Sequence, residues 1–221
     1  MCGRFTVTVD PEVLMERFHL EAAEEMPAPR YNVAPTQNVS VVLNESPTRL
    51  STVQWGLIPP WAKDPAIGAQ MINARAETVP EKPAFRVAFK KRRCLVLADG
   101  FYEWRKEDDG KTKTPMLVRL KSGEPFAMAG LWEIWTSPEG QERRTCTIIT
   151  TNPNELVAPI HNRMPAILPR DAEAAWLDAS LEPLALAALL KPYPKDEMQA
   201  YAVSRRVNAP ANDDPELVQP V

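Results

Sequence analysis

The feature that most constrains the fold of this chain is its proline content, because 23 of the 221 residues are proline. This is about twice the number that an average usage of roughly 5% would give. Proline lacks a backbone N–H and fixes φ at about −65°, so it interrupts helices and is excluded from central strands. The prolines stand between apolar segments and do not form one tract. We therefore expect many short elements joined by ordered loops, which excludes a bundle of long helices.

Apolar runs separated by turn residues predict about eight strands and four helices. We expect strands at residues 39–43, 49–55, 93–98, 101–106, 115–120, 125–131, 144–151 and 199–204. We expect helices at residues 82–90, 171–177 and 182–190. Another helix should begin at Asp10, which can cap a first turn that holds Pro11.

The order of these elements predicts the fold class. Strands and helices do not alternate along the chain, so we expect an α+β fold and not a parallel sheet. Residues 1–221 should form a single domain, whose mainly antiparallel sheet curls into a barrel-like core with peripheral helices. Residues 209–221 are rich in Pro, Asp and Asn, and we expect them to form an extended tail.

Composition excludes several classes of protein. The net charge is −3 and no apolar run approaches the roughly 20 residues of a membrane span. The first residues lack the pattern of a signal peptide, so we expect a cytoplasmic location and no membrane partner. Three cysteines and two histidines, without metal-ligand spacing, predict neither a disulfide framework nor a metal site. Cys94 and Cys146 stand in apolar runs and are expected to be buried strand residues.

Cys2 follows the initiator methionine and could carry unusual chemistry. Removal of Met1 would leave an α-amine and a thiol on adjacent carbons, with reference pKa values of about 8 and about 8.5, so that both are partly deprotonated at neutral pH. Such an aminothiol condenses with an aldehyde to a Schiff base, which the sulfur closes to a thiazolidine. An N-terminal cysteine can also act as a nucleophile with its own amine as base. The alternative is a frayed terminus without a role.

Several loops hold polar residues that a fold alone does not require. Asn73 and Arg75 lie within one short segment, and His161 lies in another. Glu103 stands in an aromatic strand, where it shares a face with Phe101, and a desolvated carboxylate there would suit a general acid/base. These residues could equally stabilise the fold, and Trp55 and Trp61 could be core residues.

Taken together, these motifs resemble the SRAP family, the "SOS response-associated peptidase" proteins. The resemblance covers nearly the whole chain, in the order that the family shows. It rests on Met1-Cys2-Gly3-Arg4-Phe5, Arg30-Tyr31-Asn32-Val33-Ala34-Pro35, Trp55-Gly56-Leu57, Asn73-Ala74-Arg75-Ala76-Glu77, residues 94–104, His161-Asn162-Arg163-Met164-Pro165 and Val203-Ser204.

The resemblance implies a covalent trap for abasic sites in single-stranded DNA, active in the DNA damage (SOS) response. Cys2 would capture C1′ of the ring-opened sugar as a thiazolidine, Asn73 would position the Cys2 amine, and Glu103 would transfer protons. His161 would help to open the sugar ring and to reverse the adduct. The resemblance also implies phosphate contacts from Arg4, Arg75 and Arg163, and a looser match places Trp61 against the bases.

We expect no cofactor, and we expect a monomer that joins the nucleoid when it binds DNA. Two other functions stay open. One is a cysteine peptidase with Cys2, His161 and Glu103 as its catalytic set, whose activity could include removal of Met1. The other is a non-catalytic reader of modified DNA bases. The Asp- and Pro-rich residues after Asn208 depart from the family pattern, which leaves phosphate contacts there without support.

Overall fold

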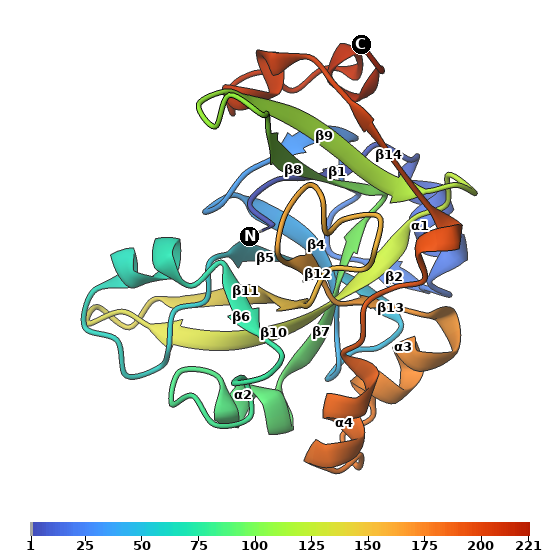
Figure 1. The fold of residues 1–221 in the computed structure, drawn as a ribbon. Helices are drawn as coiled ribbons and strands as arrows, with labels where there is room; N and C mark the ends of the chain where they lie inside the picture. Colours follow the sequence, from blue (N-terminus) through green and yellow to red (C-terminus); the bar gives the residue numbers. More distant parts are fainter. Residues whose placement is uncertain (1) are drawn as a thin grey trace.

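A computed structural model describes residues 2–221, within which five strands close into a barrel (Figure 1). Antiparallel pairing runs in the order β5–β4–β7–β10–β11, and a parallel pairing of β11 with β5 completes the ring. A ring of five strands cannot alternate direction all the way round, so one pair has to be parallel. The strands are β4 (Asn38–Leu43), β5 (Arg49–Trp55), β7 (Arg93–Ala98), β10 (Phe126–Thr136) and β11 (Glu142–Thr151).

A second sheet in the described chain lies against the barrel, in the order β14-β9-β8-β1-β3. Asp99 alone separates β7 from β8, so the chain passes directly from the barrel into this sheet. The buried Asp99 carboxylate accepts hydrogen bonds from both Thr6 and Thr8, which fixes the corner. The strands are β1 (Phe5–Val7), β3 (Arg30–Val33), β8 (Gly100–Lys106), β9 (Lys113–Leu120) and β14 (Met198–Ala202).

Short elements cover the periphery. The α-helices are α1 (Pro11–Arg17), α2 (Arg86–Lys91), α3 (Arg170–Leu177) and α4 (Pro183–Leu189). The 3-10 helices are η1 (Pro65–Gln70), η2 (Lys195–Glu197), η3 (Arg205–Asn208) and η4 (Pro215–Val218). The remaining strands are β2 (Ala22–Ala23), β6 (Asn73–Arg75), β12 (Met164–Pro165) and β13 (Ile167–Leu168). Among residues 2–221, no helix has the length and apolar character needed to cross a membrane.

The α+β class, the mainly antiparallel pairing and the barrel-like core are confirmed. Cys94 and Cys146 are buried strand residues, as expected. Several boundaries differ from the expected ones: the strand expected at residues 125–131 extends to Thr136, and the strand expected at residues 199–204 ends at Ala202. The helix expected at residues 82–90 begins only at Arg86, because residues 78–85 form turns. His19 lies beyond the end of α1 in a left-handed conformation, with φ of 52°, and is exposed. The expected removal of Met1 lies outside the described residues.

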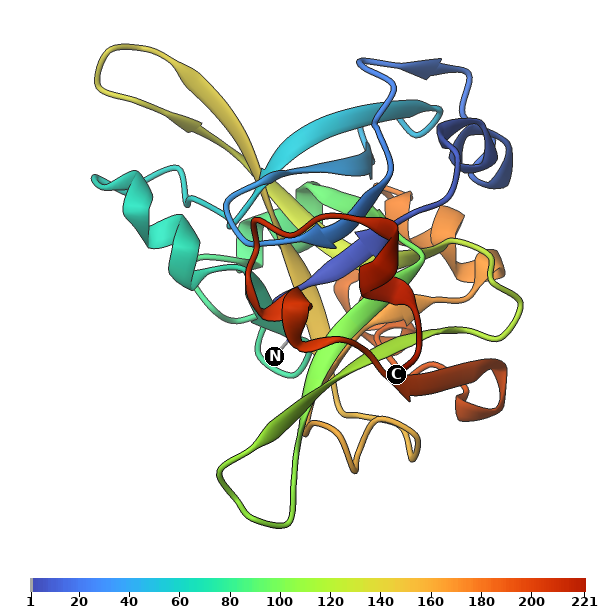
Figure 2. The ribbon, with the colours of Figure 1, turned by 90° about the horizontal axis from the view of Figure 1, so that it is seen from above.

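The expectation of an extended tail at residues 209–221 needs correction, because this segment folds back onto the second sheet (Figure 2). Its η4 buries Leu217 completely, against a cluster that includes Tyr102. The Asp213 carboxylate accepts hydrogen bonds from the backbone of Tyr31 and Asn32 in β3. The buried Leu217 side chain and the hydrogen-bonded Asp213 carboxylate thus hold residues 209–221 against the sheet, although this segment is mostly polar.

Candidate active site around Cys2

The register of β1 against β8 brings Cys2 to Glu103. Phe5 pairs with Phe101, and the Tyr102 amide donates to the Arg4 carbonyl at 2.9 Å. Continuing toward the N-terminus, the chain therefore passes along Glu103. Cys2 is fully buried and Glu103 is 2% exposed, so neither group is part of a frayed end.

Asn73 reaches Cys2 from the other sheet. Its strand β6 pairs in parallel with β11, where Asn73 lies opposite Ile148. The side-chain Nδ2 of Asn73 donates to the backbone carbonyl of Cys2 at 2.8 Å. Its Oδ1 is buried and accepts no hydrogen bond from residues 2–221. A buried acceptor without a donor destabilises the folded protein. Oδ1 is therefore positioned to accept a hydrogen bond from an N–H group beside Cys2.

His161 completes the cluster from the loop between β11 and β12. Its Nδ1 lies 3.9 Å from Oε2 of Glu103. The backbone N–H of Arg163 points at the same Nδ1 over 3.1 Å. The Arg163 carbonyl oxygen lies 3.2 Å from this Nδ1 as well, so the backbone of Arg163 can either donate to an unprotonated Nδ1 or accept from a protonated one. Three side chains from three separate segments, Asn73, Glu103 and His161, thus converge on Cys2.

Burial shifts the pKa values of three of these groups. It raises the pKa of Glu103 to about 7. Burial, followed by the nearby Glu103 carboxylate, raises the pKa of the Cys2 thiol well above its usual range. Burial lowers the pKa of His161. Desolvation favours the neutral form of each group, so burial opposes the partial ionisation of the thiol that its reference pKa predicts.

The raised pKa of Glu103 predicts that the free energy of unfolding depends on pH. Above about pH 4.5 the unfolded chain loses this proton, whereas the folded protein keeps it until about pH 7. The stability that Glu103 contributes is complete below pH 4.5 and is lost as the pH rises through 7. Glutamine does not ionise, so Glu103→Gln should gain stability relative to the wild type across this window. Calorimetric melting at several pH values tests this, and a pH-independent difference would contradict it.

The three arginines expected to contact phosphates differ in their surroundings. Arg75 is exposed and follows Asn73 on the same face of β6. Arg4 donates to Asn32 Oδ1 at 2.8 Å and to the carbonyls of Val207 and Asn208, so it also holds the C-terminal segment. The guanidinium of Arg163 makes hydrogen bonds to four protein oxygens. Arg75 is thus the arginine most available to an incoming anion.

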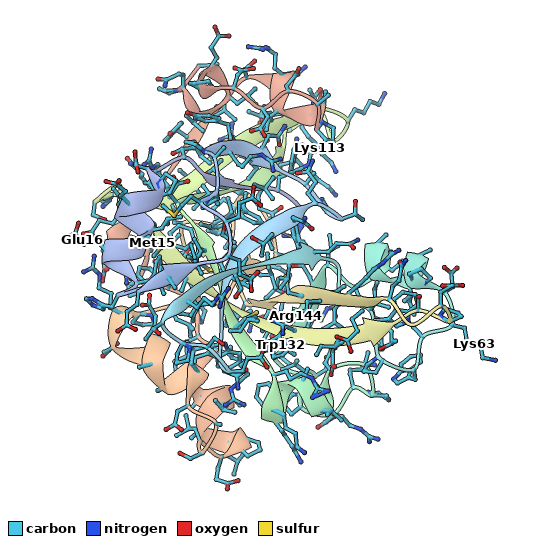
Figure 3. All side chains as sticks on the ribbon, turned by 180° about the vertical axis from the view of Figure 1, so that it is seen from behind. Met15, Glu16, Lys63, Lys113, Trp132 and Arg144 are labelled. Carbon is cyan, nitrogen blue, oxygen red and sulfur yellow. The ribbon has the colours of Figure 1, made fainter. Side chains whose placement is uncertain are left out.

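Trp61 is 62% exposed, whereas Trp55 is fully buried in the barrel. The loop after Trp61 is anchored, because Trp135 Nε1 donates to the Ala62 carbonyl at 2.8 Å. Figure 3 shows Lys63, in the same loop, at the opposite end of the molecule from α1. An exposed indole on an anchored loop can serve as a stacking surface for bases.

Two residues of the surroundings were not predicted from the sequence. Asn32 is fully buried and its amide donates to backbone carbonyls of the C-terminal segment, including that of Asn212 at 2.8 Å. Glu77 makes a bidentate ion pair with Arg163. Both stand inside the quoted motifs, so motif membership was the available signal, but their partners are distant in sequence. Among residues 2–221, no cluster of three or more His, Cys, Asp or Glu could hold a metal ion.

Comparison with known proteins gives a consistent picture. The sequence model of the SOS response associated peptidase (SRAP) family matches residues 1–210. The chain is 51% identical over 223 residues to Abasic site processing protein YoqW of Bacillus subtilis (strain 168), covering 99% of each chain. It is 31% identical over 271 residues to Abasic site processing protein HMCES of Pongo abelii, covering 100% of this chain and 76% of that protein.

Solved structures show the same fold. The crystal structure of a protein from Bacteroides thetaiotaomicron superimposes with a TM-score of 0.91 at 31% identity, and the match covers 100% of both chains. A protein from Bordetella bronchiseptica superimposes with a TM-score of 0.78 at 28% identity, over 92% of this chain and 100% of that one.

Proposed function

Because this chain belongs to the SOS response associated peptidase (SRAP) family, we propose that it captures abasic sites in single-stranded DNA through a covalent bond to Cys2. The observation that carries the proposal is the convergence of Asn73, Glu103 and His161 on a buried cysteine at position 2. The relatives named as abasic site processing proteins support the choice of substrate. Removal of Met1 would provide the free amine that the chemistry needs.

The proposed reaction starts at the amine. An abasic sugar opens to an aldehyde at C1′, the Cys2 nitrogen adds to that carbon, and loss of one water leaves a C=N bond. The thiol then adds across this bond: sulfur binds C1′ and the thiol proton passes to nitrogen. The product is a thiazolidine, with one water released and no redox change. The raised pKa of the thiol supports this order, because the sulfur is protonated while the amine attacks.

Each neighbouring side chain has a proposed role in these steps. Asn73 Oδ1 would accept a hydrogen bond from the Cys2 amine and orient its lone pair. Glu103, with its pKa at about 7, would move the proton that leaves with water. His161, whose Nδ1 lies 3.9 Å from Glu103, would assist sugar-ring opening and the reverse reaction.

Intact mass spectrometry of the purified protein tests the proposal. After incubation with a single strand that holds one abasic site, we expect protein without Met1, heavier by the mass of the strand minus one water. Peptide mapping should place the adduct on Cys2. An undamaged strand of the same sequence should give no adduct. Absence of the adduct, or its placement on another residue, would refute the proposal.

Among the three proposed phosphate contacts, Arg75 is the one with an exposed side chain. Each phosphate contact contributes about 0.7 to the slope of log affinity against log salt for single strands. We expect Arg75→Ala to weaken binding of undamaged single strands of any sequence alike, and to reduce this slope by about 0.7. Fluorescence anisotropy over a salt series measures both. An unchanged slope would remove Arg75 from the phosphate contacts.

The two alternative functions fit the site less well. A cysteine peptidase needs a thiolate, which an adjacent imidazolium or other cation stabilises. Here the pKa of the Cys2 thiol is raised and that of His161 is lowered, so both groups favour their neutral forms. A reader of modified bases would not need a buried cysteine with a raised-pKa carboxylate beside it.

We also propose that the protein acts as a monomer on DNA.

A further inference from the structure

An ion pair between Glu77 and Arg163 borders the candidate active site. Arg163 Nη1 donates to Glu77 Oε1 at 2.7 Å, and Nη2 donates to Oε2 at 2.9 Å. These hydrogen bonds lower the pKa of Glu77, so the carboxylate is ionised at neutral pH. The Arg163 side chain is 12% exposed and that of Glu77 is 46% exposed. The arginine is therefore the buried partner, and it depends on the carboxylate for its counter-charge.

Two further acceptors hold the same guanidinium. Nη2 donates to the Thr150 carbonyl at 2.6 Å, and Nη1 donates to Asn152 Oδ1 at 3.2 Å. The Thr150 carbonyl already accepts a hydrogen bond from the Ala76 amide at 2.9 Å. Without Glu77, two N–H groups of a largely buried cation would lose their partners, and the Arg163 side chain would have to move toward water.

The backbone of Arg163 connects this ion pair to the imidazole. The Arg163 N–H that points at His161 Nδ1 and the guanidinium that binds Glu77 belong to one residue. Glu77 itself stands four residues after Asn73, whose amide holds the Cys2 carbonyl. The ion pair thus joins the segment that contacts Cys2 to the loop that carries His161.

We propose that Glu77 is a positioning residue, which acts through Arg163 to fix the His161 imidazole beside Glu103, in the one tautomer that the Arg163 backbone selects at Nδ1. The kinetic consequence of this inference rests on the proposed capture of abasic DNA. Its structural consequence, the state of the imidazole, does not depend on that reaction.

The kinetic test compares Glu77→Gln with the wild type on abasic single strands. Displacement of a reacting group by a fraction of an ångström slows a reaction strongly. We therefore expect the limiting rate of adduct formation to fall about tenfold. The strand concentration at half-maximal rate should change less than about twofold, because Glu77 is not proposed to touch DNA. Glu77→Asp keeps the charge and should recover most of the rate.

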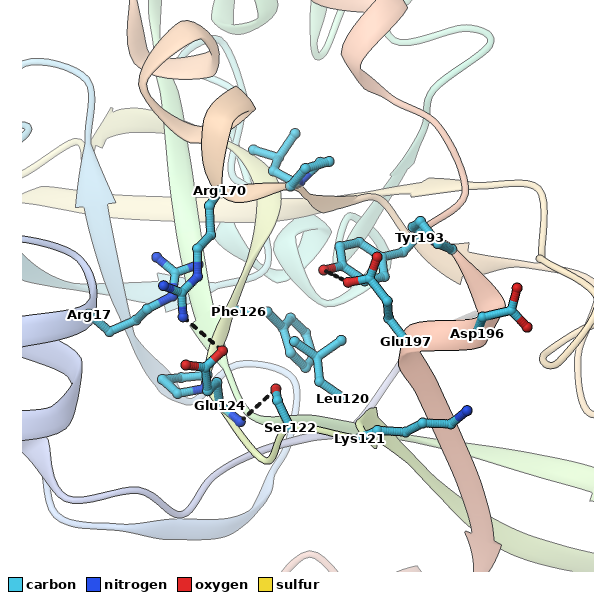
Figure 4. Close-up of a pocket in the computed structure, with 14 residues that line it drawn as sticks. Arg17, Leu120, Lys121, Ser122, Glu124, Phe126, Arg170, Tyr193, Asp196 and Glu197 are labelled. Atoms are coloured by element: carbon cyan, nitrogen blue, oxygen red, sulfur yellow. Dashed lines mark hydrogen bonds and ion pairs between the residues drawn. The ribbon is translucent and has the colours of Figure 1, made fainter.

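A matched control comes from an ion pair elsewhere on the surface. Nη2 of Arg170 lies 2.7 Å from Oε2 of Glu124, and the two side chains are 59% and 54% exposed. They border a pocket of about 460 Å³ that none of the candidate site residues lines (Figure 4). Glu124→Gln removes the same charge from an exposed Arg–Glu ion pair, and it should leave the rate unchanged.

Nitrogen NMR of histidine-labelled protein gives a readout without DNA. The sequence has two histidines, so the exposed His19 serves as an internal reference. We expect wild-type His161 to show a single dominant tautomer, with one nitrogen protonated and the other not. In Glu77→Gln its two nitrogen shifts should move toward the average of mixed tautomers, while those of His19 stay constant.

The outcomes separate the two proposals. If wild-type protein forms no adduct, the proposed function fails and the NMR comparison still decides the role of Glu77. Wild-type His161 shifts in Glu77→Gln would overturn the inference. So would tighter DNA binding at an unchanged rate, because Glu77 would then compete with phosphate for Arg163. If Glu77→Gln does not fold, the same measurements on Glu77→Asp apply, with a smaller shift in the same direction.

Discussion

Replacing Cys2 with alanine is expected to abolish the stable adduct with abasic single-stranded DNA completely. The ring that makes the adduct stable needs sulfur to bond C1′, and alanine offers no atom in that place. Cys2→Ser should still form an imine, because the amine remains, but this adduct should reverse unless a reductant traps it. Denaturing gels with and without borohydride distinguish the two kinds of adduct.

The other cysteines provide the control for this experiment. Cys146 is as fully buried as Cys2, but it lies in the barrel strand β11 opposite Trp55. Cys146→Ala should therefore form the adduct as the wild type does, after its fold is verified by thermal melting. A stable adduct of unchanged yield in Cys2→Ala would show that another nucleophile reacts, and it would refute the proposed function.

The barrel was predictable because its strands are long apolar runs bounded by turn residues, such as 93–98 and 144–151. The shortest strands, of two or three residues, were not predictable. β12 consists of Met164 and Pro165, and β6 of three residues, so neither has enough length to show an alternating pattern. Their existence depends on β11, which supplies a partner edge on both sides.

The candidate site could be predicted in its members but not in its geometry. The period of two in a strand correctly placed Glu103 on the face of Phe101, and burial raised its pKa as desolvation predicts. Contacts between distant segments were not accessible in this way. The hydrogen bond from Asn73 to Cys2 spans 71 residues, and the ion pair of Arg163 with Glu77 spans 86. Such contacts are set by the pairing of β6 and β12 with β11, which the local pattern does not reveal.

The thiol illustrates the same limit for energetics. A reference pKa describes a cysteine in water, and the first residues of a chain are usually hydrated. Here the segment before β1 is covered by both sheets, so Cys2 is fully buried. The sequence offers no signal for that burial, because Gly3 and Arg4 are not apolar. The shift of the Cys2 thiol toward its neutral form, on which the proposed order of bond formation rests, follows from tertiary structure alone.

The second large effect is expected for Glu103→Gln, which should slow adduct formation by about 10²–10⁴-fold, the usual contribution of a positioned acid/base. Glutamine keeps the shape and the hydrogen-bonding oxygen of the side chain but cannot exchange a proton. Because the pKa of Glu103 is about 7, the wild-type rate should change with an inflection near pH 7. This inflection should be absent in the variant. Rapid-quench time courses between pH 5 and pH 9 measure both.

Glu133 allows the effect of proton transfer to be separated from that of burial. It is 2% exposed, like Glu103, and burial likewise raises its pKa, but it lies in β10 and pairs with Arg92 at 3.0 Å. Glu133→Gln therefore removes an equally buried carboxyl without touching the candidate site, and its rate and pH profile should match the wild type. If adduct formation slowed equally in both variants, the loss of a buried carboxyl would affect the rate through the stability of the fold and not through proton transfer. Slowing in Glu103→Gln alone, with loss of the inflection near pH 7, would identify Glu103 as the group that transfers the proton.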